Sequence, residues 1–147
     1  MNELEFLRGR NERTGTGREV WSGNRMGEKR VLLVDDDAEL TDILHDYLED
    51  NGLQVTEAGS ARQALYLLKH SGPYDLVLLD IGLPDLDGLA VLERLRLDGY
   101  DLPVVMATAE SNSLKVRRAR QLGVSAYLLK PFDLDRLVQI VDRLLAA

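Results

Sequence analysis

The sequence predicts an α/β fold in which five parallel strands form a doubly wound sheet with helices on both faces. Short apolar runs alternate with longer segments of helical periodicity, and this alternation is typical of repeated strand–helix units. The apolar runs recur about every 22 to 27 residues, which leaves room for one helix and short loops in each unit. Five such units fit into 147 residues as one domain with a substantial core.

Four of the five predicted strands are continuous apolar runs, which favours a sheet that is buried on both faces. The strand cores begin near Val31, Leu53, Leu76, Pro103 and Ser125. Crossover connections between parallel strands are right-handed, so few strand orders remain. The flavodoxin-like order 2-1-3-4-5 fits a chain of this length, and its switch point lies between the first and third strands.

The first two predicted helices have clear boundaries. The first follows Asp37, which we expect to cap it, and ends at Asn51-Gly52. The second begins at Ser60, a favoured N-cap residue. The residues expected to face the core are Leu40, Ile43, Leu44, Tyr47 and Leu48 in the first helix, and Ala61, Ala64, Leu65 and Leu68 in the second.

The remaining three helices also begin at polar residues. We expect Asp85 and Asp87 to shape a turn and cap the third helix, which opens at Asp87-Gly88. The fourth helix covers residues 112–122 approximately and stops at Gly123, and the fifth begins at Asp133. The predicted core-facing residues are Leu89, Leu92 and Leu95, then Leu114, Val116, Ala119 and Leu122, then Leu134, Leu137, Val138, Val141 and Leu144.

The composition narrows the classes of function. Residues 1–29 carry six basic and five acidic side chains, so the remainder carries 12 basic against 20 acidic and is a poor binder of nucleic acid. There is no cysteine, which excludes disulfides and thiolate metal sites, and no apolar stretch typical of a signal peptide or membrane span. We expect a cytoplasmic protein with a flexible N-terminal extension over residues 1–28 and one folded domain over residues 29–147.

Polar side chains follow four of the apolar runs at the point where each run ends. Asp35 and Asp36 follow the first, Asp80 the third, Thr108 closes the fourth and Lys130 follows the fifth. Because ligands bind at the carboxyl ends of the strands in open α/β sheets, we expect these side chains to share one cleft. The sequence therefore predicts a cation and phosphate site.

The charges of this cleft indicate its chemistry. Carboxylates about 4 Å apart repel one another by about 4 kcal/mol per pair at an effective dielectric of 20, and one lysine cannot neutralise three of them. A divalent cation can, and carboxylate oxygens with water are the ligands that Mg²⁺ prefers. A carboxylate can also attack phosphorus to form an aspartyl-phosphate. Asp80 stands alone and is the candidate nucleophile, whereas the paired Asp35 and Asp36 suit metal binding.

Four segments carry a resemblance to a known family. In order and spacing, VLLVDDD, LVLLDIGLPDLDG, VVMATAE and SAYLLKPF resemble the signature segments of response-regulator receiver domains, which act in two-component and phosphorelay systems. The resemblance implies that Asp80 is the phosphoacceptor. It further implies Mg²⁺ bound by Asp35, Asp36, Asp80 and the backbone carbonyl of Gly82, phosphate-binding residues Thr108 and Lys130, switch residues Thr108 and Tyr127, and a cis peptide bond before Pro131.

The resemblance also implies a signalling switch that assists only its own phosphorylation and dephosphorylation, and is not otherwise an enzyme. A histidine kinase or phosphotransfer protein would supply the phosphoryl group to Asp80. Phosphorylation would change the conformation of the face formed by the fourth helix, the fifth strand and the fifth helix. That face would control a downstream protein, an output domain or a second copy of the chain.

Two alternatives use the same fold differently. A phosphorylation-independent adaptor would need only the binding surfaces. A phosphatase that turns over through an aspartyl-phosphate would use Asp80, but such enzymes usually place a general acid two positions after the nucleophile. Gly82 occupies that position, which argues against the phosphatase.

Overall fold

The computed structural model describes residues 29–146, and the extension predicted over residues 1–28 lies outside this part of the chain. None of the described helices is long and apolar enough to cross a membrane. In chain order the elements are β1 (Arg30–Val34), α3 (Ala38–Asp50), β2 (Gln54–Ala58), α4 (Ala61–His70), β3 (Leu76–Leu79), α5 (Gly88–Leu97), β4 (Val104–Thr108), α6 (Ser113–Gln121), β5 (Ala126–Leu129) and α7 (Leu134–Ala146). The predicted alternation of strands and helices is confirmed.

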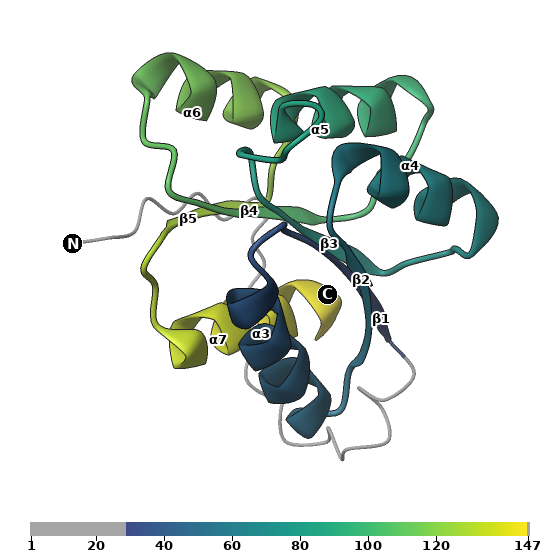
Figure 1. The fold of residues 1–147 in the computed structure, drawn as a ribbon, viewed down its shortest axis with the longest axis vertical. Coiled ribbons are helices and arrows are strands. Elements are labelled where there is room, and N and C mark those ends of the chain that lie inside the picture. Colours follow the sequence, from purple (N-terminus) through teal and green to yellow (C-terminus); the bar gives the residue numbers. More distant parts are fainter. Residues whose placement is uncertain (1–28, 147) are drawn as a thin grey trace.

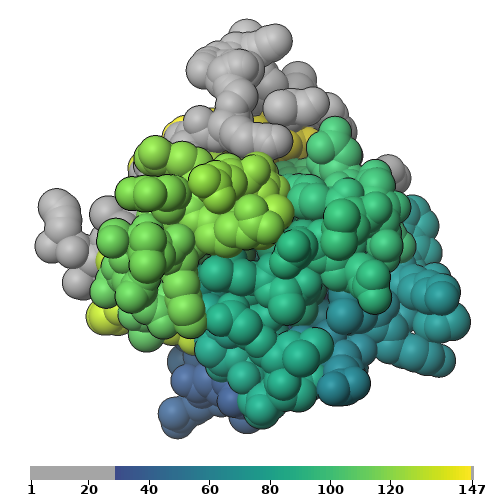
Figure 2. Space-filling model, turned by 90° about the horizontal axis from the view of Figure 1, so that it is seen from above, coloured from purple at the N-terminus to yellow at the C-terminus, as the bar shows by residue number. Residues whose placement is uncertain are grey.

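The strands form one parallel sheet in the order β2-β1-β3-β4-β5, which confirms the predicted doubly wound topology. Figure 1 shows the helices in two layers, with α4, α5 and α6 on one face of the sheet and α3 and α7 on the other. Figure 2 looks onto the outer surface of the layer that contains α4, α5 and α6. The order reverses direction at β1 and β3, so the switch point lies between these two strands.

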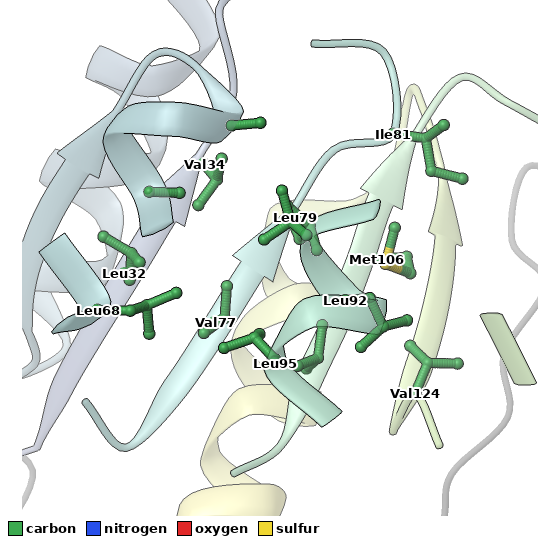
Figure 3. Close-up of a cluster of buried hydrophobic side chains, with 14 of the residues drawn as sticks. Leu32, Val34, Leu68, Val77, Leu79, Ile81, Leu92, Leu95, Met106 and Val124 are labelled. Atoms are coloured by element: carbon green, nitrogen blue, oxygen red, sulfur yellow. The ribbon is translucent and has the colours of Figure 1, made fainter. Parts of the chain in front are cut away.

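The core consists of two apolar clusters, one on each face of the sheet. Both form because successive side chains of a strand point to opposite faces, and the apolar runs therefore supply both clusters at once. Figure 3 shows the cluster under α4 and α5, which includes Leu32, Val34, Leu68, Val77, Leu79, Leu92, Leu95 and Met106. Leu33, Leu44, Leu78 and Ile140 belong to the cluster under α3 and α7.

Polar residues begin four of the helices as the sequence predicts. The side chains of Asp37, Ser60, Asp87 and Asn112 accept hydrogen bonds from the backbone N–H groups of Leu40, Gln63, Leu89 and Leu114, at 2.8 to 3.1 Å. Each bond satisfies a donor that the first helical turn leaves without an intrahelical acceptor. The caps fix where the loops end and the helices begin at the edge of the sheet that carries the predicted site.

Two residues that we expected to face the core are exposed. Ile43 is 51% exposed and Leu114 is 68% exposed. In α3 the buried stripe contains Thr41 instead, because its hydroxyl donates a hydrogen bond to the Asp37 carbonyl at 2.8 Å and so loses no polar contact on burial. In α6 the one fully buried helical residue is Ala119.

Candidate functional site

The carboxyl ends of four strands meet at one edge of the sheet. Asp35 follows β1, Asp80 follows β3, Thr108 ends β4 and Lys130 follows β5. Backbone hydrogen bonds continue the ladder beyond the strands, from Asp80 N–H to the Val34 carbonyl at 3.0 Å and from Lys130 N–H to the Thr108 carbonyl at 2.8 Å. These polar residues are therefore held by sheet backbone and not by loops.

Three carboxylates gather at the switch point. One oxygen each from Asp35, Asp36 and Asp80 lies within 4.8 Å of the others. The Lys130 ammonium lies 2.7 Å from Asp35 Oδ2 and 3.1 Å from Asp80 Oδ2, which joins the last strand to the first and third. The side chains of Asp35 and Asp80 are only 4% and 9% exposed, whereas Asp36 is exposed. The site thus carries three acidic groups and one ammonium, with one acidic group open to solvent.

For both Asp35 and Lys130, burial shifts the pKa in one direction and the charge of the ion-pair partner shifts it in the other. Burial raises the pKa of Asp35, although Lys130 and the Asp37 N–H both favour its ionised form. Burial alone would lower the pKa of Lys130, but hydrogen bonds and charge from Asp35 and Asp80 together outweigh it and raise this pKa. Lys130 is therefore held as a cation. Any further positive charge placed beside Asp35 would favour the ionised form of this carboxyl.

The oxygen atoms gathered at the site fit a hard cation. Asp35 Oδ1 accepts from the Asp37 N–H at 2.9 Å and Asp80 Oδ1 from the Gly82 N–H at 3.2 Å, which orients both carboxylates. Within residues 29–146, no hydrogen bond is made to the carbonyl oxygen of Gly82, which lies in the exposed loop after β3. Three clustered carboxylates and an unpartnered carbonyl are the ligand types that Mg²⁺ takes in proteins.

Thr108 and Tyr127 lie beside this cluster on β4 and β5. Thr108 is buried, and its Oγ1 accepts a hydrogen bond from the Glu110 N–H at 3.2 Å. Tyr127 is fully buried, and its hydroxyl donates to the Glu110 carbonyl at 2.6 Å. Burial, with the nearby charge of Glu110, raises the pKa of Tyr127 to about 12, so the phenol stays protonated. Both side chains therefore contact the same short segment after β4.

Sequence reasoning missed one residue at this edge. The Lys115 ammonium, in the first turn of α6, lies 3.1 Å from Asp87 Oδ2 and 3.7 Å from Glu110 Oε1. The contact with Asp87 raises the pKa of Lys115. The lysine connects the loop after β3 with the loop after β4, but a lysine on an exposed helix has no local signal that would identify distant partners.

The peptide bond between Lys130 and Pro131 is cis. A second cis bond, between Gly72 and Pro73, was not expected from the sequence. Among the residues predicted for the site, the structure thus brings together Asp35, Asp36, Asp80 and Lys130. It places Thr108 and Tyr127 on the neighbouring strands, where Thr108 makes no hydrogen bond to the cluster within residues 29–146.

A five-stranded doubly wound sheet with an acidic site at its switch point defines a class of α/β protein, and comparison with known proteins identifies the family. The model of the response regulator receiver domain matches residues 31–142. The two-component response regulator ARR11 of Arabidopsis thaliana is 40% identical over 109 residues, which are 74% of this chain and 21% of that protein.

Two solved structures agree with this assignment. A CheY-like receiver domain protein from Methanospirillum hungatei has a TM-score of 0.76 at 29% identity, over 80% of this chain and 93% of that chain. The regulator TrrA from Thermotoga maritima, in complex with Mg²⁺–BeF, has a TM-score of 0.70 at 32% identity, over 79% of this chain and 98% of that chain. The chain belongs to the response regulator receiver domain family of two-component systems.

Proposed function

We propose that this receiver domain is a phosphorylation-dependent switch in which Asp80 accepts the phosphoryl group. One observation carries the proposal: Asp80 is buried at the switch point, within reach of two further carboxylates, with the Lys130 ammonium 3.1 Å from its Oδ2. A nucleophile for phosphoryl transfer needs positive charge placed against the phosphoryl oxygens, and Lys130 supplies one such charge.

The proposed step is a transfer from a phosphohistidine. An Asp80 oxygen attacks phosphorus, the new O–P bond forms, the P–N bond breaks, and its electron pair stays on the imidazole nitrogen, which then binds a proton. Lys130 and the Thr108 hydroxyl would hold two of the phosphoryl oxygens. The hydrogen bond from the Gly82 N–H to Asp80 Oδ1 fixes the carboxylate plane during the attack.

The same residues fit a bound Mg²⁺ ion. Asp35, Asp36, Asp80 and the Gly82 carbonyl would hold it, and the complex of TrrA with Mg²⁺–BeF supports this assignment for a family member. A bound divalent cation supplies charge that neutralises the carboxylates and the incoming phosphoryl oxygens. The residues of this chain contribute orientation, since Asp35 and Asp80 are fixed by Lys130 before any ligand binds.

The output of the switch would pass through Thr108 and Tyr127. Phosphorylation adds a charge of about −1.5 to −2 beside Thr108, which favours a hydrogen bond from its hydroxyl to the phosphoryl group. Thr108 and Tyr127 both contact Glu110, so movement of Thr108 changes the environment of Tyr127. We infer that phosphorylation shifts the population of the domain between two packings of the face formed by α6, β5 and α7. This shift would control the binding of a partner to that face.

The partners follow from the same proposal. Receiver domains interact with histidine kinases or phosphotransfer proteins, and this one would accept its phosphoryl group from such a protein. The matched segment spans about a fifth of ARR11, so a downstream protein or an output domain would carry the response. A second copy of the chain could bind the same face. We further propose a cytoplasmic location, a domain over residues 29–147, and no direct contact with nucleic acid or membrane.

Intact-mass measurement tests the proposal. The protein is incubated with acetyl phosphate or phosphoramidate, with Mg²⁺ and with EDTA, and also with a set of phosphorylated histidine kinases. We expect a gain of one phosphoryl group that requires Mg²⁺. If no donor, small or protein, produces this gain, the switch is refuted and the chain is a phosphorylation-independent adaptor.

Mg²⁺ should stabilise the fold, and Asp36→Asn should remove most of this effect. At a concentration ten times its dissociation constant, an ion that binds only the folded state adds about 1.4 kcal/mol. Without Mg²⁺ the variant should melt at a higher temperature than wild type, because one of three repelling charges is gone. Melting curves with Mg²⁺ or EDTA check this. Asp46→Asn, an exposed change on α3, is the control and should keep the wild-type response.

A further inference from the structure

The loop that joins β3 to α5 carries the Gly82 carbonyl, and its own contacts include an antiparallel bridge between Gly82 and Asp87 and the hydrogen bond from the Gly82 N–H to Asp80 Oδ1. Residues 82–87 are mostly exposed. The backbone bonds near this carbonyl are short-range, from the Leu83 and Gly88 N–H groups to the Ile81 carbonyl at 2.9 and 2.8 Å. None of the hydrogen bonds in the described part of the loop is made to the Gly82 carbonyl oxygen itself, so contacts at the following residues can also restrict the direction in which this carbonyl points.

Asp85 provides that support by reaching across to α4. Its Oδ1 accepts from the Ala61 N–H and its Oδ2 from the Arg62 N–H, both at 2.9 Å, while Oδ1 also accepts from the Leu86 N–H at 3.0 Å. These bonds lower the pKa of the Asp85 carboxyl, with the Arg62 N–H the strongest influence. The sequence-based expectation that Asp85 helps to cap the third helix is therefore wrong: Asp87 caps α5, and Asp85 caps α4.

The start of α4, which Asp85 binds, is held in place by its own contacts. Ala61 is fully buried in the core, and α4 has its own cap in Ser60, whose Oγ accepts from the Gln63 N–H at 3.1 Å. On the far side of the same loop, Asp87 is bound to Lys115 of α6 at 3.1 Å. The segment that follows Asp80 is thus attached to a helix on each side, at Asp85 and at Asp87.

We propose that Asp85 is a positioning residue that holds the Gly82 carbonyl toward the acidic cluster and thereby sets the affinity of the site for Mg²⁺. The inference rests on the proposed function, because it concerns the same cation. Only Leu83 and Pro84 separate Gly82 from Asp85, so the two bonds to α4 restrict the few dihedral angles that orient the carbonyl. Groups that orient a metal ligand typically change metal affinity by 10- to 100-fold when they are lost.

The experiment compares two ways of removing hydrogen bonds from the start of α4. Asp85→Ala and Ser60→Ala each remove acceptors for N-terminal N–H groups of that helix, but only Asp85 belongs to the loop of the site. Mg²⁺ titrations followed by two-dimensional amide NMR give the dissociation constants. We expect the dissociation constant for Mg²⁺ to increase about tenfold in Asp85→Ala, by a smaller factor in Asp85→Asn, and by less than twofold in Ser60→Ala.

Phosphoryl uptake provides a second measurement. The Mg²⁺ concentration for half-maximal uptake should rise in parallel for the Asp85 variants, while the rate at saturating Mg²⁺ stays within about twofold of wild type. The inference is overturned if Asp85→Asn, which keeps the size of the side chain, binds Mg²⁺ as tightly as Ser60→Ala does. A wild-type protein that neither binds Mg²⁺ nor takes up phosphate would instead overturn the proposed function.

Discussion

Asp80→Asn should abolish phosphoryl uptake while the fold is retained. The amide nitrogen of asparagine carries no negative charge and its oxygen is a weak nucleophile, so no acyl phosphate forms. The shape of the side chain is preserved, and the amide oxygen can still accept from the Gly82 N–H or from Lys130. Because one carboxylate leaves a crowded cluster, the variant should be at least as stable as wild type.

Intact mass after treatment with a phosphodonor and Mg²⁺ measures the loss. Asp98→Asn is the control, because Asp98 is an exposed residue at the C-terminal end of α5 and should leave uptake at the wild-type level. Continued gain of a phosphoryl group by the Asp80 variant would show that another residue is the acceptor. Peptide mapping would then locate that residue.

Gly88→Ala should lower the free energy of unfolding by about 3 kcal/mol, the upper part of the range for overpacked interiors. A Cβ atom at Gly88 would lie 2.0 Å from the carbonyl oxygen of Asp80 and 2.8 Å from Ile81 Cα. Both atoms belong to the backbone, so no side-chain rotation relieves the overlap. The start of α5 would have to move away from the residue after β3, and phosphoryl uptake should fall as Asp80 is displaced.

Gly82→Ala is the matched control six residues earlier. A Cβ atom there would have no neighbour within 4 Å, so this variant should stay within about 1 kcal/mol of wild type. Urea unfolding of both variants gives the comparison. Equal stabilities of the two variants would mean that the close approach of α5 to Asp80 does not exist in solution.

The fold could be predicted because its signals are local. Each apolar run, such as Val31 to Val34, marks a strand without reference to the rest of the chain, and polar residues such as Asp37 and Ser60 mark helix starts. The strand order then follows from handedness and chain length. The inward faces of the helices were harder to predict, and Ile43 and Leu114 are exposed because neighbouring elements decide which side of a helix is covered.

Local patterns in the chain were enough to predict the strand order and the polar residues that meet at the edge of the sheet, because parallel strands place their carboxyl ends together whatever the loops do. The longer-range contacts of the loops are visible only in the folded molecule. Asp85 caps α4 across 23 residues, and Lys115 of α6 lies 3.1 Å from Asp87 across 28 residues. Such contacts depend on the relative positions of elements that no local pattern encodes. For this reason the acidic site could be predicted from the sequence, whereas the contact that supports its Gly82 loop could not.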